Sequence, residues 1–585
     1  MIENFLLQVN KPARYIGGEW NVSRNDFSKA EIKFALCFPD LYEVGMSNLG
    51  LRILYGILNN APGVCCERFF SCAEDMEKLL RAQGREIFSL ESGKPLRAFD
   101  LIGFSLGSEL NYTNVLSMLE LGGLPLKAAE RDSRHPLIIG GGPCALNPEP
   151  MHEFFDLFFI GEAEEAILEL IDAWRRMKQE YISGKISKTD LLIELTRIEG
   201  VYAPSLYEVT YDREGKIERF VPKSQAVSAV VKKRVVASLD TSFFPTEWLV
   251  PFIQIIHDRI SIEIMRGCPN RCRFCQARSQ YFPYRIRSVE NVLGLADKAY
   301  LSTGYDEISL CGLSVSDYPG IQPLLQRLLA KFREKAVSIS LPSIKARALT
   351  GELAELIATI KKTGLTFAPE AGTEKLRRIL AKDFSEEEFF QALAQAYSAG
   401  YQHVKLYFML GLPFEELADL DGIVEFSTRV SELRRKLNNS PAQVNLSVNA
   451  FIPKPHTPLA FCRMQGIEEI KERQAYLKAR IKNRRLKVSF HDPHMSFVEG
   501  ILSRGDRRLG SVILNAYSKG ARFDAWGNYF SFQKWQNAFC EEKIDPGFYL
   551  RPRPPEEILP WDHIDTGVSR KMLVEEFNLA QDVKK

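Results

Sequence analysis

Apolar runs of strand length recur along the chain and are separated by amphipathic segments of helix length. In the first part they lie at Ile32 to Phe38, Glu86 to Leu90, Leu101 to Ser105, Pro136 to Gly140 and Leu157 to Ile160. Strands that alternate with helices form parallel sheets with helices on both faces. The pattern predicts a doubly wound, Rossmann-like α/β domain over residues 31–180, preceded by an extension over residues 1–30.

A second alternating series follows a stretch of different character. Residues 181–250 change polarity in short steps, and Asp212 to Gly215 predicts the turn of a β-hairpin in this connector. The next six strands predict a partial (βα)6 barrel over residues 251–490, with its chemistry at the carboxyl ends of the strands. Residues 491–585 break the series and predict a mixed C-terminal extension. The six predicted strands are Ile260–Met265, Glu307–Cys311, Val337–Leu341, Leu365–Ala368, His403–Phe408 and Val444–Ala450.

Charge and composition narrow the classes of partner. The 76 basic and 74 acidic residues give a net charge of +2, which excludes a whole-protein field that attracts nucleic acid or anionic membrane. No apolar run is long enough to cross a bilayer, and the N-terminal residues lack the pattern of a signal peptide, so we expect a cytoplasmic protein without a membrane partner. The 11 cysteines should then be reduced, and a tight cysteine cluster indicates a metal or redox site.

One such cluster follows the first strand of the second series. Cys268, Cys272 and Cys275 have the spacing C-x3-C-x2-C. Three thiolates on one loop can hold three irons of a 4Fe-4S cubane and leave the fourth iron open to a small molecule. A zinc site would need another closely placed ligand, and neither Cys311 nor Cys462 belongs to a zinc-like pair. The loop is also too polar for three cysteines that are merely buried.

This cysteine loop resembles that of the radical S-adenosylmethionine (radical SAM) superfamily. The resemblance implies that the open iron chelates the amino and carboxylate groups of S-adenosylmethionine, and that one electron cleaves its carbon–sulfur bond. It also implies an electron donor such as flavodoxin or ferredoxin. Cys268, Cys272 and Cys275 would be the metal ligands at the catalytic centre.

Four further positions match cofactor-contacting turns of that superfamily. Gly312 follows the second strand, where the family meets the methionyl amino group, although the usual acidic residue is absent. Glu370 and Gly372 follow the fourth strand, and Gly411 ends the fifth at the turn that faces adenosine. For Glu370 the alternative is an acid in the first turn of a helix, stabilised by the helix dipole.

The loop after the first strand of the chain resembles that of cobalamin-binding domains. Asp40, Tyr42 and Gly45 fill the frame D-x-H-x-x-G with tyrosine at the histidine position. Ser105 follows a later strand, like the family serine near the nucleotide tail of cobalamin. Glycines after the next strand would leave space for a bulky ligand. Each motif is weak alone, and their order together favours cobalamin; these glycines are Gly140, Gly141 and Gly142.

Tyr42 predicts the mode of cobalamin binding. A phenol is a poor cobalt ligand compared with imidazole, so we expect cobalamin bound base-off without histidine ligation. The alternative is that Tyr42 only packs at the edge of the domain, as aromatic side chains commonly do.

Nearly the whole chain resembles one family of cobalamin-binding radical SAM proteins, through motifs such as PDLYEVGMSNLG, GGGPCALNPEP, FIPKPHTP and LPWDHID. The resemblance implies a transferase that moves a methyl group to an unactivated carbon. Radical rearrangement, electron transfer and a non-catalytic sensor or assembly factor are alternatives. RNA, ribosomal protein, peptide and small metabolite remain open as substrates. Two basic segments, residues 480–487 and 503–510, could contact RNA phosphates, or they could be solvated surface.

Overall fold

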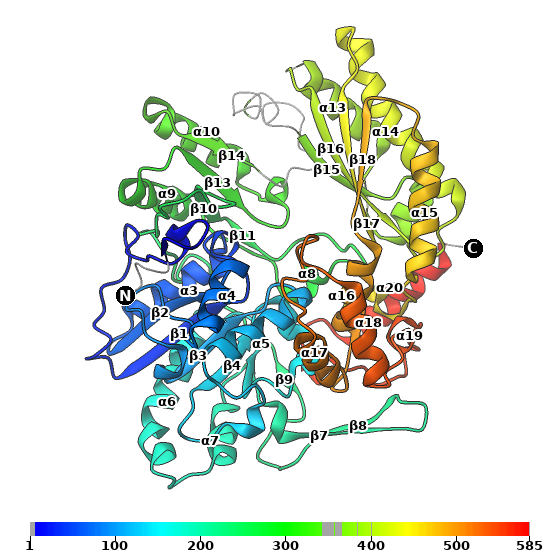
Figure 1. The fold of residues 1–585 in the computed structure, drawn as a ribbon. Helices are drawn as coiled ribbons and strands as arrows, with labels where there is room; N and C mark the ends of the chain where they lie inside the picture. Colours follow the sequence, from blue (N-terminus) through cyan, green and yellow to red (C-terminus); the bar gives the residue numbers. More distant parts are fainter. Residues whose placement is uncertain (1–5, 342–355, 357–364, 383, 399, 584–585) are drawn as a thin grey trace.

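The computed structural model describes residues 6–341, 356, 365–382, 384–398 and 400–583. Figure 1 shows a blue and cyan N-terminal α/β part, two β-sheets in green and yellow, and a mainly helical C-terminal part in orange and red. Residues 1–5 of the predicted N-terminal extension and residues 342–355 and 357–364 of the predicted barrel lie outside the described residues. No helix in the described part of the chain has both the length and the apolar content needed to cross a membrane.

The N-terminal part contains a six-stranded sheet in the order β2-β1-β3-β4-β5-β6, parallel except for β6. This order places β1 between β2 and β3, and ligands of such sheets bind beyond the carboxyl ends of the strands at this switch in direction. The predicted doubly wound fold is confirmed. The strands are β1 (Ile32–Phe38), β2 (Val64–Phe70), β3 (Leu101–Ser105), β4 (Leu137–Gly141), β5 (Leu157–Phe159) and β6 (Val201–Tyr202). The helices are α2 (Tyr42–Gly45), α3 (Leu49–Asn60), α4 (Glu74–Ala82), α5 (Tyr112–Leu121), α6 (Ala166–Ile182) and α7 (Lys188–Leu195).

One strand prediction in this domain is wrong. Residues 86–90 form only an isolated bridge, from Phe88 to Pro95, whereas the second strand is β2, which pairs with β1 along its full length. The charged residues inside β2 conceal it in the sequence. Arg68 is nevertheless fully buried, because Glu19 and Glu91 neutralise it at 2.8 and 2.6 Å. Compensated charges can therefore sit in a strand that is otherwise apolar.

The second series forms two separate parallel sheets, one of three strands and one of four. The first half-sheet is β10 (Ile260–Glu263), β13 (Glu307–Cys311) and β14 (Ser338–Ser340); the second half-sheet is β15 (Leu365–Glu370), β16 (His403–Leu410), β17 (Gln443–Ala450) and β18 (Leu486–Phe490). All six predicted strands are present, and β18 is an addition. The helices are α8 (Gln276–Gln280), α9 (Val289–Thr303), α10 (Ile321–Phe332), α12 (Glu374–Ile379), α13 (Glu386–Ser398), α14 (Leu417–Asn438) and α15 (Ile467–Arg480).

The two half-sheets have different hydrophobic cores. Buried residues of β10 and β13 belong to one continuous core that includes the N-terminal sheet and the helices of the C-terminal extension. Buried residues of β15 to β18 form a separate core with α13 and α14. Figure 1 shows the same division, with the green first half-sheet next to the blue domain and the yellow second half-sheet apart from it.

The C-terminal extension packs on the N-terminal domain. Thr113 donates a hydrogen bond to Asp524 at 2.8 Å, and the indole of Trp526 donates one to Asp40 at 3.0 Å. Arg504 is fully buried and donates to four backbone carbonyls, and Arg507 binds Glu149 at 2.6 Å. These two arginines of segment 503–510 are used inside the protein and are not available to phosphates. The helices are α16 (Pro493–Arg504), α17 (Leu509–Ser518), α18 (Phe532–Glu541), α19 (Gly547–Leu550) and α20 (Arg570–Asp582).

Short antiparallel and parallel pairs complete the fold. The predicted hairpin of the connector is present as β7 (Tyr207–Tyr211) and β8 (Ile217–Pro222). The strand β9 (Val231–Lys232) pairs in parallel with β19 (Ile564–Asp565), which joins the connector to the C-terminal extension. A ribbon of β11 (Met265–Arg266) and β12 (Arg285–Ile286) flanks the cysteine loop. The C-terminal extension therefore contacts both the N-terminal domain and the connector.

Candidate functional site

A cavity of about 640 Å³ lies between the N-terminal sheet and the first half-sheet. Its volume is within the usual range for cofactor and ligand pockets. One side is built from β1, α3, β3 and β4, and the other from residues around β11, α8 and the end of β13. The lining includes Phe34, Leu36, Ile53, Leu54, Gly103, Ser105, Ile139, Gly141, Gly142, Glu263, Met265, Arg266, Tyr281, Cys311 and Gly312. Predicted positions of the N-terminal domain and Gly312 of the barrel therefore contribute to a single cavity, whereas Cys268, Cys272 and Cys275 are absent from its lining.

The predicted serine and two of the three predicted glycines line this cavity. Ser105, Gly141 and Gly142 do so, whereas Gly140 faces the other side of the sheet, where a Cβ would lie 2.8 Å from the Phe158 ring. Neighbouring residues of a strand point to opposite faces, which explains the difference. Gly103 also lines the cavity and was missed, although the same alternation from Ser105 would have indicated it.

The loop after β1 places its predicted cofactor residues outside the cavity lining. Asp40, Tyr42 and Gly45 are absent from the lining; the Tyr42 hydroxyl donates to Glu19 Oε1 at 2.8 Å. Burial, and then the Glu19 charge, raise the pKa of Tyr42 well above its usual value. The cavity wall is made instead by the next turn, where Asn48 accepts a hydrogen bond from the Leu51 amide and caps α3.

Arginine and glutamate side chains join the two sides of the cavity. Arg266 binds Glu164 at 2.6 Å and Glu263 at 2.8 Å, and Arg285 binds Glu162 at 2.6 Å. Burial alone would raise the pKa of Glu162, but the two guanidinium groups hold it below its usual value. No sequence signal indicates the pairs with Glu162 and Glu164, because their members come from separate domains. They fix the end of β5 against β11 with charge-assisted hydrogen bonds.

The three cysteines lie on the loop between β11 and α8. Burial raises the pKa of the Cys272 thiol to about 11, and the Lys382 ammonium opposes this while the thiols of Cys275 and Cys268 add to it. The three thiols are thus close enough to interact. Among the described residues, no group of three or more His, Cys, Asp or Glu side chains is arranged to bind a single metal ion. A cubane requires a different arrangement, because each cysteine binds its own iron.

Arg273 anchors this cysteine loop to distant parts of the chain. Its guanidinium donates to Glu576 of α20 at 3.0 Å and to the carbonyls of Arg378 and Ile379 at 3.0 and 2.9 Å. Its backbone amide donates to the Leu380 carbonyl at 2.9 Å. The end of α12 and the C-terminal helix therefore hold the loop between them. No local sequence signal could have revealed this anchor.

Glu370 lies close to the cysteine loop. It ends β15 with a left-handed φ of 68°, and its carboxylate is 3.5 Å from Lys382. Burial raises the pKa of Glu370, and Lys382 opposes the shift. The helix α12 begins only at Glu374, so the interpretation of Glu370 as an acid in the first helical turn is wrong. Its charge also raises the pKa of Cys272, which indicates proximity to that thiol.

The three other predicted glycines have separate structural settings. Gly312 lines the cavity next to Met265, whose Cγ would lie 2.4 Å from an added Cβ. At Gly372 a Cβ would lie 2.2 Å from the Ile423 amide, so this glycine permits close packing of α14. Gly411 has a φ of 77° and donates its amide to the Glu415 carboxylate at 3.0 Å. Gly372 and Gly411 thus shape the second half-sheet.

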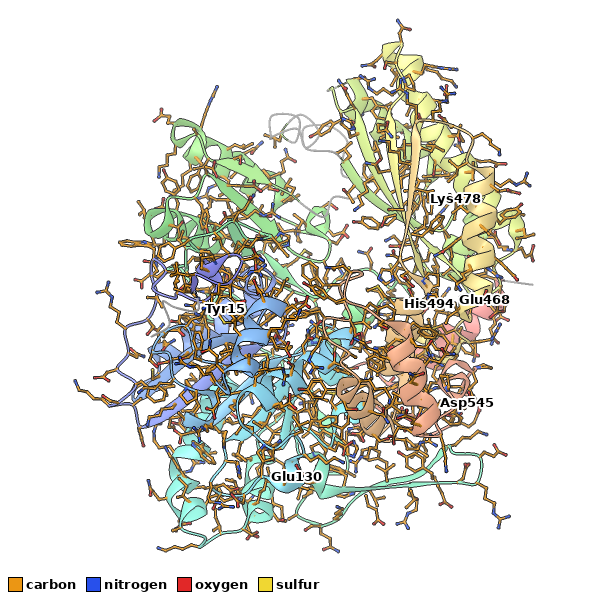
Figure 2. The ribbon with its side chains drawn as sticks, viewed as in Figure 1. Tyr15, Glu130, Glu468, Lys478, His494 and Asp545 are labelled. Carbon is orange, nitrogen blue, oxygen red and sulfur yellow. The ribbon has the colours of Figure 1, made fainter. Side chains whose placement is uncertain are left out.

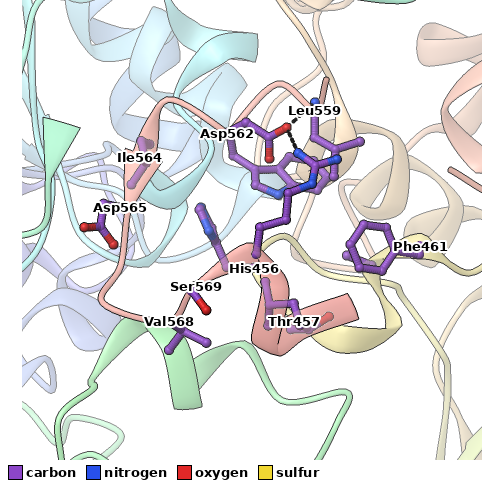
Figure 3. A pocket seen from close by; sticks show the side chains of 13 residues that line it. His456, Thr457, Phe461, Leu559, Asp562, Ile564, Asp565, Val568 and Ser569 are labelled. Carbon is purple, nitrogen blue, oxygen red and sulfur yellow. Dashed lines mark hydrogen bonds and ion pairs between the residues drawn. The ribbon is translucent and has the colours of Figure 1, made fainter. Parts of the chain in front are cut away.

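A second cavity of about 220 Å³ lies where the C-terminal extension meets the loop after β17 (Figure 3). The buried ring of His456 contacts the Leu146 carbonyl through Nε2 at 3.0 Å. On the opposite wall Asp562 and Arg570 form an ion pair. The segment LPWDHID, residues 559–565, therefore packs against the barrel loop FIPKPHTP, residues 451–458.

Comparisons with known proteins decide the family. Residues 50–204 match the family model described as radical SAM proteins, N-terminal, and residues 262–427 match that of the radical SAM superfamily. The chain belongs to the radical SAM superfamily. The two matches of this radical SAM chain span more than half of its length and include the cysteine loop. The predicted radical SAM identity is confirmed.

Similar proteins include relatives of full length and of part length. An uncharacterized protein of Methanocaldococcus jannaschii is 27% identical over 83% of the radical SAM chain and 91% of its own. The ribosomal protein uS12 methylthiotransferase RimO of Desulfotalea psychrophila is 28% identical over 29% of this chain and 39% of its own. The radical SAM methyltransferase TsrM of Kitasatospora setae, solved with cobalamin and a [4Fe-4S] cluster, is 12% identical with a TM-score of 0.48, covering 87% of this chain and 99% of its own.

Proposed function

We propose that this radical SAM enzyme uses a 4Fe-4S cluster, S-adenosylmethionine and cobalamin to transfer a methyl group to an unactivated carbon. The observation that carries the proposal is the shared cavity, which Ser105 and Gly141 line from one domain and Cys311 and Gly312 line from the other. A cofactor in the N-terminal part of this cavity would face the strand ends next to the cysteine loop. The two predicted cofactor regions would then serve one reaction.

The lining fits a bulky cofactor whose tail ends in an aromatic base. Part of the wall is formed by Phe34, Ile53, Leu58 and Ile139, and the glycines of β3 and β4 leave the sheet face open. None of the lining residues is a histidine, and the Tyr42 hydroxyl is engaged by Glu19. The lining thus supplies no imidazole to a metal. This supports cobalamin bound without a histidine ligand.

The cysteine loop fits an iron–sulfur cluster. Cys268, Cys272 and Cys275 would each hold one iron, and Arg273 would keep the loop in place through α12 and α20. The burial that raises the pKa of the Cys272 and Cys275 thiols would be offset on binding, since iron stabilises the thiolate form. Lys382 beside Glu370 would contribute positive charge near the thiolates.

The cofactors supply the radical and methyl chemistry, and the protein positions them. The Arg266 and Arg285 ion pairs would keep the two walls of the cavity at a fixed separation. The apolar lining from β1 and α3 would exclude water, which protects a reactive carbon centre from side reactions. Substrate would enter at the polar side of the cavity, near Glu164 and Gln280.

The test begins with cofactor content after anaerobic purification from cells supplied with cobalamin and iron. We expect one four-iron cluster and one base-off cobalamin per chain, followed by 5′-deoxyadenosine formation when S-adenosylmethionine and a reductant are added. Cys272→Ala should lose iron and this activity, whereas Cys462→Ala, at a buried cysteine outside the loop, should keep both.

A second pair of variants separates cobalamin from the cluster. At Gly141 the nearest atom to an added Cβ is 3.8 Å away, so Gly141→Leu can fold while filling the cavity. We expect it to lose cobalamin and keep iron. Gly294→Leu, on the exposed side of α9 with nothing within 4 Å, is the matched control and should keep both. A wild-type chain that retains a cluster and no cobalamin would contradict methyl transfer through cobalt.

A further inference from the structure

Six basic residues and no acidic residue lie between positions 478 and 487, where α15 ends and β18 begins. All six side chains are exposed, and only Arg480 has an acidic partner, Asp421, at 2.9 Å. Figure 2 labels Lys478 on α15, on the opposite side of the view from the N-terminal domain. The six are Lys478, Arg480, Lys482, Arg484, Arg485 and Lys487.

The positive charge continues onto the uncovered face of the second half-sheet. Lys405, Asn445 and Lys487 lie side by side on β16, β17 and β18. The preceding residues of the three strands, Val404, Val444 and Leu486, are buried in the core against α13 and α14. Because successive side chains of a strand point to opposite faces, Lys405, Asn445 and Lys487 lie on the other face of the sheet. Lys405 is exposed and lies over the ring of Tyr407, 4.6 Å from its centroid.

The end of α14 extends the same surface. Arg435 and Lys436 are exposed in its last turn. The start of β17, which follows α14 after a short loop, is tied to the basic segment, because the Val444 amide and the Gln443 side chain both donate to the Arg485 carbonyl, at 2.9 and 3.0 Å. We call this set the basic rim: Lys405, Arg435, Lys436, Lys478, Arg480, Lys482, Arg484, Arg485 and Lys487.

The rim concentrates positive charge in a protein that is nearly neutral. The net charge is only +2, yet seven of the nine rim residues face solvent without an acidic partner among the described residues; the exceptions are Arg480 with Asp421 and Arg435 with Glu432. Cations held together repel each other, and a polyanion relieves the repulsion while releasing its own counterions. The surface therefore suits a ligand with regularly spaced negative charges.

We infer that the basic rim binds the phosphate backbone of RNA. Beside the cations, Tyr407 offers a ring on which a base can stack, and Asn445 and Ser447 offer polar groups for bases or ribose hydroxyls. A membrane-binding surface would add large apolar side chains. Leu437 is the one exposed large apolar residue between 429 and 487 in the described part of the chain. The inference needs neither cluster nor cobalamin, and so it stands apart from the proposed function.

The experiment measures binding of the full chain to a fluorescein-labelled, mixed-sequence RNA hairpin by fluorescence anisotropy at several salt concentrations. The rim variant carries Lys482→Gln, Arg484→Gln, Arg485→Gln and Lys487→Gln. We expect its affinity to fall by about tenfold or more, and the slope of log K against log salt to fall by about three, since each lost phosphate contact removes about 0.7–0.9.

A matched control removes the same charge elsewhere. The control variant replaces four exposed basic residues of the N-terminal domain and the hairpin, none of which has an ion pair among the described residues. The substitutions are Arg176→Gln, Lys185→Gln, Arg213→Gln and Arg219→Gln. This control should bind RNA within about twofold of the wild type. Equal losses in both variants, no RNA binding by the wild type, or tighter binding to phosphatidylserine vesicles than to RNA would each overturn the inference. Cofactor content, measured in parallel, tests the proposed function separately.

Discussion

The two half-sheets are built alike and stabilised differently. Each has parallel strands with helices packed on one face, but the core of the first is continuous with the N-terminal domain and that of the second is separate. The faces turned away from these helices differ in charge. Glu263 and Glu307 lie on this face of the first half-sheet, each paired with an arginine, and Lys405 and Lys487 lie on this face of the second. The first half-sheet is thus part of the cavity wall, and the second carries the basic rim.

This difference shows how one topology can serve two purposes. The first half-sheet is held in place by its shared core and by the Arg266 ion pairs, so its strand ends have a fixed relation to the N-terminal sheet. The second half-sheet reaches the same site through Glu370, Lys382 and the end of α12, which lie beside the cysteine loop. Stability measurements on the two half-sheets should therefore respond to different perturbations.

Acid is expected to have the largest effect, and to act on the shared core. Burial lowers the pKa of His152 and His456 to about 4 and that of His563 to about 3. Below pH 6.5 the unfolded chain binds protons that the folded chain excludes, so stability falls as the pH falls toward 4. Each histidine contributes up to about 1.4 kcal/mol per pH unit. Denaturant unfolding between pH 7 and 4 measures the slope.

A histidine variant controls the acid experiment. His456→Gln should reduce the slope by up to about 1.4 kcal/mol per pH unit, because it removes one of the three buried rings. Hydrogen exchange should show that acid opens the N-terminal domain and C-terminal extension first. Stability that is independent of pH over this range would contradict the assignment of these rings as neutral.

The buried charges of β2 allow the shared core to be broken directly. Arg68→Met leaves the Glu19 and Glu91 carboxylates buried without their partner and should cost about 4 kcal/mol. Hydrogen exchange should accelerate in β1, β2, β10 and β13 together, and not in β16 to β18. Lys78→Met removes an exposed partner of Glu74 and should cost less than about 0.5 kcal/mol. Equal acceleration in both half-sheets would mean that the cores are one.

The converse experiment breaks the separate core. Leu406 is fully buried in β16, so Leu406→Ala should cost about 3 kcal/mol through lost burial and the cavity left behind. Exchange should accelerate in β15 to β18 and leave the N-terminal sheet protected. Lys405→Ala, one residue away on the uncovered face, should change stability by less than about 0.5 kcal/mol.

Tyr42→Phe gives the smallest expected change and sharpens the role of the first loop. It removes the hydrogen bond to Glu19 and should cost about 1 kcal/mol, since Arg68 still pairs with that carboxylate. Cobalamin content should not change, because Tyr42 lies outside the cavity lining. A loss of cobalamin without a change in folding would show that the hydroxyl acts on the cofactor.

The strands were largely predictable, and the failures have physical causes. Long apolar runs gave β1, β3 and the six barrel strands, because those strands are buried on at least one face. The strand β2 was concealed by Arg68, whose charge is compensated by residues far away in sequence. The strand β18 was missed because it is short and only Leu486 in it is buried, whereas β16 and β17 each have at least three buried residues.

The site was predictable where it depends on strand ends. Ser105 and Gly141 are the last residues of β3 and β4, and Gly312 directly follows β13, so all three lie at the strand ends that line the cavity. Tyr42 is not at a strand end. It is the first residue of the short helix α2, and its hydroxyl points to Glu19. Contacts between domains, such as Arg266 with Glu164, leave no periodic trace in a single sequence.

The anchor of the cysteine loop also sets an order of events during synthesis. Arg273 and Glu576 are 303 residues apart, so the ribosome completes the cysteine loop long before it has synthesised Glu576, the partner of Arg273. At a translation rate of about 5–20 residues per second, the three thiols of the nascent chain would lie on an unanchored loop for about 15–60 seconds. Iron delivered in that interval would meet a loop without its C-terminal support. We therefore expect the proposed cluster to be assembled after translation has passed α20.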